Sequence, residues 1–131
     1  MLILFETEKL KLEYEYELVN LIEKSSNQIL LEDDFYGDPT CGIIDSSNKW
    51  AIIGGIHLTF WTPSKTQKFH SYEFEHISDL RIKDDNTIEI LTDPWSEKSS
   101  IWELNLNTSV LTKIRKFTDY RNKKYTDNVV W

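Results

Sequence analysis

Strict alternation of apolar and polar residues is the feature that most constrains the fold of this chain. In KLKLEYEYEL (9–18), every second residue is leucine or tyrosine, and each residue between them is lysine or glutamate. Successive side chains of a strand point to opposite faces, so the pattern predicts a strand with one dry and one wet face. Tyr14, Leu18, Leu21 and Ile22 also fit helical spacing, so a helix within 9–24 is the alternative.

Short apolar runs separated by turn residues continue to residue 117. They predict strands at 29–32, 41–45, 49–53, 56–61, 78–83, 87–92, 101–106 and 110–117, with partial alternation at 69–74. Residues 62–67 predict a surface loop. Turn signals that recur about every eight to twelve residues are typical of antiparallel all-β folds.

The predicted fold is therefore mainly β: an antiparallel two-sheet sandwich or a partly open barrel in one domain, 1–131, with room for one short helix. A helix at 9–24 would make the architecture α+β. NKWAIIGGIHLTFW is typical of the strands in a propeller blade. A blade needs about 40 residues and about four or more blades close the ring, so the length argues against a propeller.

Glycine, proline and cysteine have structural explanations. Gly54-Gly55 separates two apolar runs and predicts a tight hairpin turn with positive φ. Gly37-Asp38-Pro39 predicts a second turn, in which glycine frees φ and proline stops the strand. Cys41 is the single cysteine, and it fits a small buried apolar residue rather than a catalytic thiolate.

The charge is uneven along the chain. The net charge is −7; residues 1–62 hold four basic and eleven acidic residues, whereas residues 63–131 hold eleven of each. An acidic surface repels nucleic acid and anionic lipid, and it attracts basic partners. No apolar run has the length of a membrane span or of a secretory signal. We therefore expect a cytoplasmic protein without nucleic-acid or membrane partners.

The acidic and histidine residues do not form a recognisable catalytic or metal motif. Glu32, Asp33, Asp34 and Asp38 cluster near Gly37, but the glutamate that completes a calcium loop is missing. His57, His70 and His76 have no metal-ligand spacing. We expect no metal, no cofactor and no catalytic residue; a small metal-dependent hydrolase using Asp33, Asp34, Asp38 and a histidine is the less favoured reading.

Five tryptophans are many for a chain of this length. Trp50, Trp61 and Trp102 lie inside apolar runs and predict core packing. Trp95 follows Asp93-Pro94 in a predicted loop, so it is the best candidate for an exposed anchor. Tyr36 in the acidic loop is the second candidate. Aromatic platforms that bind sugars would give the alternative function, a carbohydrate- or small-ligand-binding β-sandwich.

The stretches DDFYGDPTCGIIDSSNKWAIIGG and NTIEILTDPWSEKSSIWELNLNT resemble bacterial polymorphic-toxin immunity proteins, which are small, acidic and β-rich. The resemblance implies a non-enzymatic protein that neutralises a cognate toxin by docking onto it. It assigns no binding residue. On physical grounds, the residues that we expect to bind such a partner are Asp33, Asp34, Tyr36, Asp38, Asp93 and Trp95.

Overall fold

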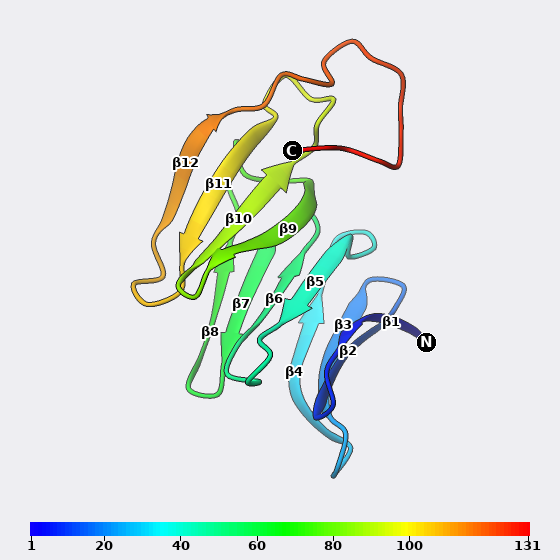
Figure 1. Cartoon of the computed structure of the whole chain (residues 1–131). Helices are drawn as coiled ribbons and strands as arrows, with labels where there is room; N and C mark the ends of the chain where they lie inside the picture. The colour runs from blue at the N-terminus through cyan, green and yellow to red at the C-terminus, as the bar shows by residue number, and fades with distance from the viewer. The chain divides into compact units, whose positions relative to one another are not determined.

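The computed structural model describes all residues, 1–131, and contains strands and turns but no helix. Twelve strands form three four-stranded antiparallel sheets, and within each sheet neighbours in space follow one another in the chain (Figure 1). The antiparallel β prediction is confirmed, and the α+β alternative is wrong. The strands divide among three sheets, where the sequence predicted a two-sheet sandwich or a partly open barrel.

The chain divides into two compact units, residues 1–77 and 78–131. The first sheet consists of β1 (Leu2–Glu6), β2 (Leu10–Glu15), β3 (Leu18–Glu23) and β4 (Gln28–Asp34). The second consists of β5 (Cys41–Ile44), β6 (Ala51–Gly54), β7 (Leu58–Thr62) and β8 (Lys65–Phe69). The third consists of β9 (Ile77–Asp84), β10 (Thr87–Thr92), β11 (Ser100–Asn105) and β12 (Leu111–Lys116).

The alternating segment 9–18 is a hairpin rather than one strand. Glu15 of β2 pairs with Leu18 of β3, which leaves Tyr16 and Glu17 as a two-residue turn. Tyr16 has a φ of 55°, the left-handed value that such tight turns require, and its ring is exposed. Alternation alone did not reveal the turn, because tyrosine and glutamate continue the pattern through it.

The core of the first unit lies between its two sheets. Leu10 and Leu12 of β2 and Val19 and Leu21 of β3 are buried there. Residues from the second sheet and from the segment that precedes it complete the same apolar cluster: Phe35, Ile44, Ala51, Ile53 and Trp61. The first sheet therefore has an inner face in this core and an opposite, outer face.

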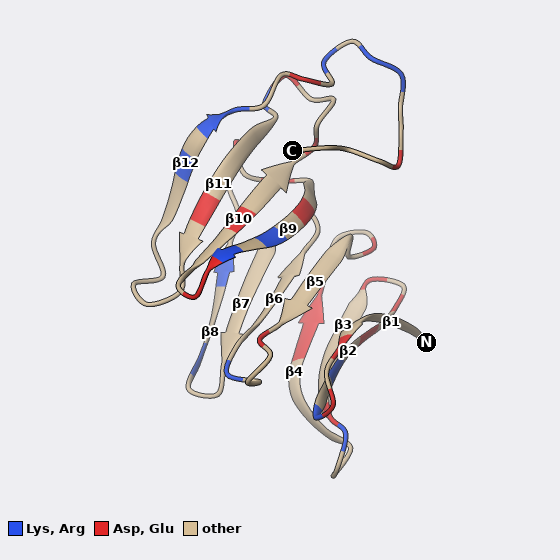
Figure 2. Ribbon diagram, viewed as in Figure 1, with Lys and Arg blue, Asp and Glu red and all other residues tan.

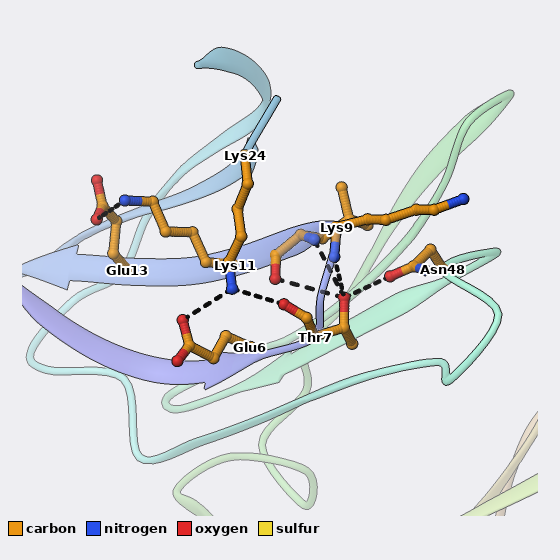
Figure 3. Close-up of polar contacts among 8 residues, drawn as sticks. Glu6, Thr7, Lys9, Lys11, Glu13, Lys24 and Asn48 are labelled. Atoms are coloured by element: carbon orange, nitrogen blue, oxygen red, sulfur yellow. Dashed lines mark hydrogen bonds and ion pairs between the residues drawn. The ribbon is translucent and has the colours of Figure 1, made fainter. Parts of the chain in front are cut away.

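The β1–β2 turn is tied to the second sheet by Thr7 (Figure 3). The Thr7 hydroxyl donates to Asn48 Oδ1 at 2.5 Å and accepts from the Leu10 amide at 3.1 Å. Lys24 Nζ donates to the Thr7 carbonyl at 2.6 Å and pairs with Glu6 at 3.2 Å. These contacts fix the start of the first sheet against the β5–β6 turn.

The prediction of positive φ at Gly54-Gly55 is wrong, because Gly37, with a φ of 96°, is the glycine with positive φ. Gly54 and Gly55 are needed because other side chains pack closely against their Cα atoms. A Cβ atom on Gly54 would lie 2.7 Å from Ile77 Cγ2, and one on Gly55 would lie 2.8 Å from Phe35 Cδ2. Cys41 is partly buried, and its Sγ would lie 2.8 Å from a Cβ atom added to Gly54.

Besides β3, most of which lies beyond the strand predicted at 9–18, two strands were not predicted. β1 lies at the edge of the first sheet, in LILFE, which has no alternation. β8 occupies part of the predicted loop 62–67. There the Thr62 hydroxyl accepts from the Lys65 amide at 3.1 Å, so Pro63-Ser64 forms a turn and polar residues pair as an edge strand.

The second unit contains the four strands predicted at 78–83, 87–92, 101–106 and 110–117, which pair as the hairpins β9–β10 and β11–β12. Leu91, Ile101 and Phe117 form its core cluster, against which the C-terminal residues Val129 and Trp131 pack. Trp131 Nε1 donates to Asp79 at 3.1 Å, and the Arg81 guanidinium lies 3.9 Å from the Trp131 ring centroid. Val130, between Val129 and Trp131, is exposed. No helix of the apolar length needed to cross a bilayer occurs in the chain.

We expect Gly54→Ala to lower the free energy of unfolding by about 1–3 kcal/mol, because the added methyl group must displace Ile77 and Cys41. Urea denaturation followed by tryptophan fluorescence measures this change. Ser47→Ala, in the exposed β5–β6 turn, is the control and should have little effect. An unchanged midpoint for Gly54→Ala would contradict the close-packing explanation.

Candidate functional site

The most strongly connected polar cluster of the first unit surrounds the Asp33 carboxylate. Asp33 is 1% exposed, and its side chain points to the inner face of β4, like its register partner Val19 on β3. Its Oδ2 accepts a hydrogen bond from the Thr59 hydroxyl and lies 3.3 Å from His57 Nε2. Its Oδ1 lies 2.8 Å from Lys68 Nζ. The cluster therefore joins the first sheet to β7 and β8 of the second.

This environment lowers the pKa of the Asp33 carboxyl. Burial by itself would raise the pKa, because it removes water from the charged form. Hydrogen bonds from His57, Lys68 and Thr59 outweigh that effect and lower the pKa from 3.8 to about 2. The carboxylate therefore stays charged at neutral pH and is neutralised by groups of the second sheet.

The geometry of the cluster is that of a structural ion pair. In a nucleophilic triad the hydroxyl bonds to the imidazole, which removes its proton. Here the Thr59 hydroxyl bonds to the carboxylate instead. The His57 ring stacks on Phe35 at 4.0 Å between centroids, with 12° between the planes. The cluster thus fixes the residues on both sides of Asp33.

The segment after Asp33 presents three of the residues predicted to bind a partner. Asp34, Tyr36 and Asp38 are exposed, and the Tyr36 ring is 88% exposed. Phe35 between them is buried, and its amide donates to the Glu17 carbonyl at 2.8 Å. The predicted turn at Gly37 has the positive φ that was expected. A buried ring therefore anchors an exposed acidic and aromatic loop, 34–38.

The structure corrects the predicted placement of Asp33, whose carboxylate is not on the surface. The three acidic residues of LEDD, 31–34, look equivalent in the sequence, but strand alternation turns Asp33 inward between Glu32 and Asp34. His57, Thr59 and Lys68 were missed as its partners. The sequence pattern that could have indicated them is weak: His57 and Thr59 are two residues apart, a spacing that places side chains on the same face of a strand.

Asp93 and Trp95 lie in the second unit, on the β10–β11 connection. Asp93 Oδ1 accepts from the Trp95 amide at 3.0 Å, so the carboxylate shapes this loop. Trp95 is half-buried rather than exposed as predicted, because two tyrosine rings of the same chain pack against it. The ring centroid of Tyr125 lies 5.0 Å, and that of Tyr120 5.9 Å, from the ring centroid of Trp95. A role of Asp93 and Trp95 in partner binding stays a prediction.

The remaining candidates are dispersed. No three histidine, cysteine, aspartate or glutamate side chains gather where they could hold a metal ion. His70 and His76 each lie within 4 Å of Glu75, on the surface. A shallow hollow of about 440 Å³ on the third sheet is lined by small polar and aliphatic residues, with Glu103 held by Lys83 at 2.8 Å.

Trp61 and Trp102 are buried, which confirms core packing for these two, and Trp50 is half-buried. No tryptophan is an exposed platform.

The lowered pKa of Asp33 predicts acid sensitivity. Because the pKa is lower in the folded state, the carboxylate stabilises the protein at pH values above about 4, and this contribution is lost as the pH falls towards about 2. We expect it to amount to about 2 kcal/mol. Urea denaturation at several pH values should show a steeper loss between pH 4 and 2 for the wild type than for Asp33→Asn. Parallel curves for the two proteins would contradict this account.

Comparison with known proteins finds a likeness in fold but none in sequence. No model of a known protein family matches the chain, and no curated protein sequence matches it. Among solved structures, the chain is similar to the crystal structure of the WD40 beta propeller domain of Doa1, with a TM-score of 0.57 and 8% sequence identity. The match covers 88% of this chain and 39% of that chain. At this identity the likeness shows the fold alone: four-stranded antiparallel sheets of the kind that form propeller blades.

Proposed function

We propose that this protein is a non-enzymatic module that binds another protein. Its likeness to a WD40 propeller, a fold that serves protein interaction, supports the general role. The cluster of ionisable groups around Asp33 supports it too, because these groups neutralise one another across two sheets rather than converge on a reacting centre. The exposed loop 34–38 is the surface that we assign to binding.

The observation that carries this proposal is the way loop 34–38 is held. Phe35 is buried against His57 and Asp33 is buried in its ion pair, so both anchor the loop from beneath. Tyr36 therefore projects from a fixed backbone between two carboxylates. Tyrosine contributes a large contact area at a low entropic cost, and fixing it in advance lowers that cost further.

We propose further that the partner is a toxin and that the protein is an immunity protein. The acidic first half of the chain, at −7 for residues 1–62, would steer it onto a basic toxin. Figure 2 displays acidic residues on β4, next to the proposed loop. The rival function, a carbohydrate-binding sandwich, gains no support from the buried or half-buried tryptophans.

Co-purification of the tagged protein with the product of its neighbouring gene tests the proposal. We expect a stable complex, and Tyr36→Ala should weaken it by about 30-fold, because a central tyrosine is a typical hot spot. Calorimetry on the purified pair measures the change.

Tyr72→Ala is the matched control, since this ring is 78% exposed and lies in the same unit. It should leave the affinity within about twofold. Equal affinity for wild type and Tyr36→Ala would reject the loop as the binding surface. Failure to recover any protein partner would reject the proposed function itself.

A further inference from the structure

Trp131 is held on the third sheet by a hydrogen bond and a cation–π contact. Its Nε1–H donates to Asp79 Oδ2 at 3.1 Å, and the Arg81 guanidinium lies 3.9 Å from the ring centroid. Asp79 and Arg81 are two residues apart on β9, so their side chains share one face of the strand. Arg81 Nε also donates to Glu89 of β10 at 2.8 Å, which orients the guanidinium. We call Asp79 and Arg81 the tryptophan seat.

The chemistry of the tryptophan seat is selective for an indole. Among aromatic rings, the face of an indole attracts a cation most strongly. An indole also has one N–H donor, which a carboxylate accepts, whereas the ring of phenylalanine has none. Trp131 packs in addition against the buried cluster of Leu91, Ile101 and Phe117. One indole ring therefore finds a cation, an acceptor and an apolar floor at the same place.

The segment that brings Trp131 to the seat is irregular and lies at the surface. Residues 118–131 form no strand, and Figure 1 shows them leaving the end of β12 and returning towards β9 and β10. None of these residues is buried, and Trp131 itself is half-buried. Asp79 is exposed even with Trp131 in place, and the Arg81 side chain is 41% exposed. The tryptophan seat can therefore be reached from solvent.

Few contacts hold this segment against the rest of the unit. Apart from those of Trp131, the Arg121 guanidinium donates to the Glu97 carbonyl at 3.0 Å, and Tyr125 packs on Trp95. Segments with few buried contacts and an exposed backbone open at a low cost in free energy. Because the segment stays attached, its effective concentration at the seat is high, and it closes again unless a competitor binds.

We infer that the tryptophan seat binds an extended segment of a protein partner that presents a tryptophan, and that residues 118–131 are a strap that this partner displaces. The strap shows which ligand the seat accepts, since Trp131 makes both selective contacts. The inference goes beyond the proposed function, because it concerns the second unit and does not involve loop 34–38.

The test uses the full chain and, as the probe, an acetylated peptide of residues 125–131, YTDNVVW. Trp131→Ala vacates the seat, so this variant should bind the peptide. The wild type should bind it at least about tenfold more weakly, because its own Trp131 competes. The same peptide carrying Trp131→Ala should not bind. A peptide carrying Trp131→Phe should bind about fivefold more weakly, because it keeps a ring but lacks the N–H donor. Titrations followed by NMR measure these affinities.

The seat itself is tested in the chain that carries Trp131→Ala. Adding Arg81→Gln should weaken peptide binding by about fivefold, because the cation over the ring is lost. Lys83→Gln is the matched control, since Lys83 lies on the same strand and pairs with Glu103 at 2.8 Å, as Arg81 pairs with Glu89. It should change the affinity by less than about twofold.

Hydrogen exchange in the wild type tests whether the strap is displaced. The Val130 amide donates to Tyr120 Oη at 2.8 Å when the strap is closed. Saturating peptide should release the strap, so this amide should lose its protection. Unchanged protection with the peptide bound would mean that the peptide binds elsewhere, which would overturn the inference.

Three further results would overturn it. The first is a Trp131→Ala chain that binds no peptide, or that binds the tryptophan and alanine peptides equally. The second is a Trp131→Ala chain that does not fold, because the strap would then be part of the core. The third is a wild-type dimer in analytical ultracentrifugation that Trp131→Ala dissociates, because the seat would then belong to Trp131 of a second copy.

The inference and the proposed function fail separately. Peptide binding that depends on Arg81, without any captured protein partner, would support the tryptophan seat and count against the function. A captured partner that is lost with Tyr36→Ala, from a protein whose vacated seat binds no peptide, would preserve the function and overturn the seat.

Discussion

The buried Asp33 carboxylate joins the two sheets of the first unit. A charged group removed from water is costly unless donors surround it. Here Lys68 and Thr59 of the second sheet supply them, together with His57, which directly precedes β7. The apolar core between the sheets is non-directional, whereas these contacts fix one position of β4 relative to β7 and β8. By fixing β4, these contacts also fix the loop that follows Asp33 and the outer face of β4.

In β4, the residue that stabilises the fold and the residue proposed for recognition point to opposite faces. Asp33 points to the core, while Glu32 and Asp34 on either side point to solvent. The same alternation along β3 buries Val19 and Leu21 inside and turns Asn20 to the outer face. Residues that look alike in the sequence therefore differ in role, because the pleat of a strand assigns successive positions to opposite environments.

Local sequence sufficed where turn chemistry and alternation agree. The strands of the second unit were predicted almost to the residue, because the turn residues Asp84-Asp85-Asn86 and Asn107-Thr108-Ser109 interrupt its apolar runs clearly. It failed for β1 and β8, since edge strands pair on one side only and need no alternation. It failed also at Gly54-Gly55, where the need for glycine comes from Ile77 and Phe35, which are distant in the sequence.

The sequence by itself determined that the chain forms antiparallel strands joined by short turns, with an acidic first half, because side-chain periodicity, turn residues and charge are local properties. Only the tertiary structure decided that the strands form three sheets, that Asp33 is buried while Tyr36 is exposed, and that Trp131 lies against Arg81. These facts depend on pairing and packing between residues far apart in the chain, and periodicity does not specify which strands meet or at which register.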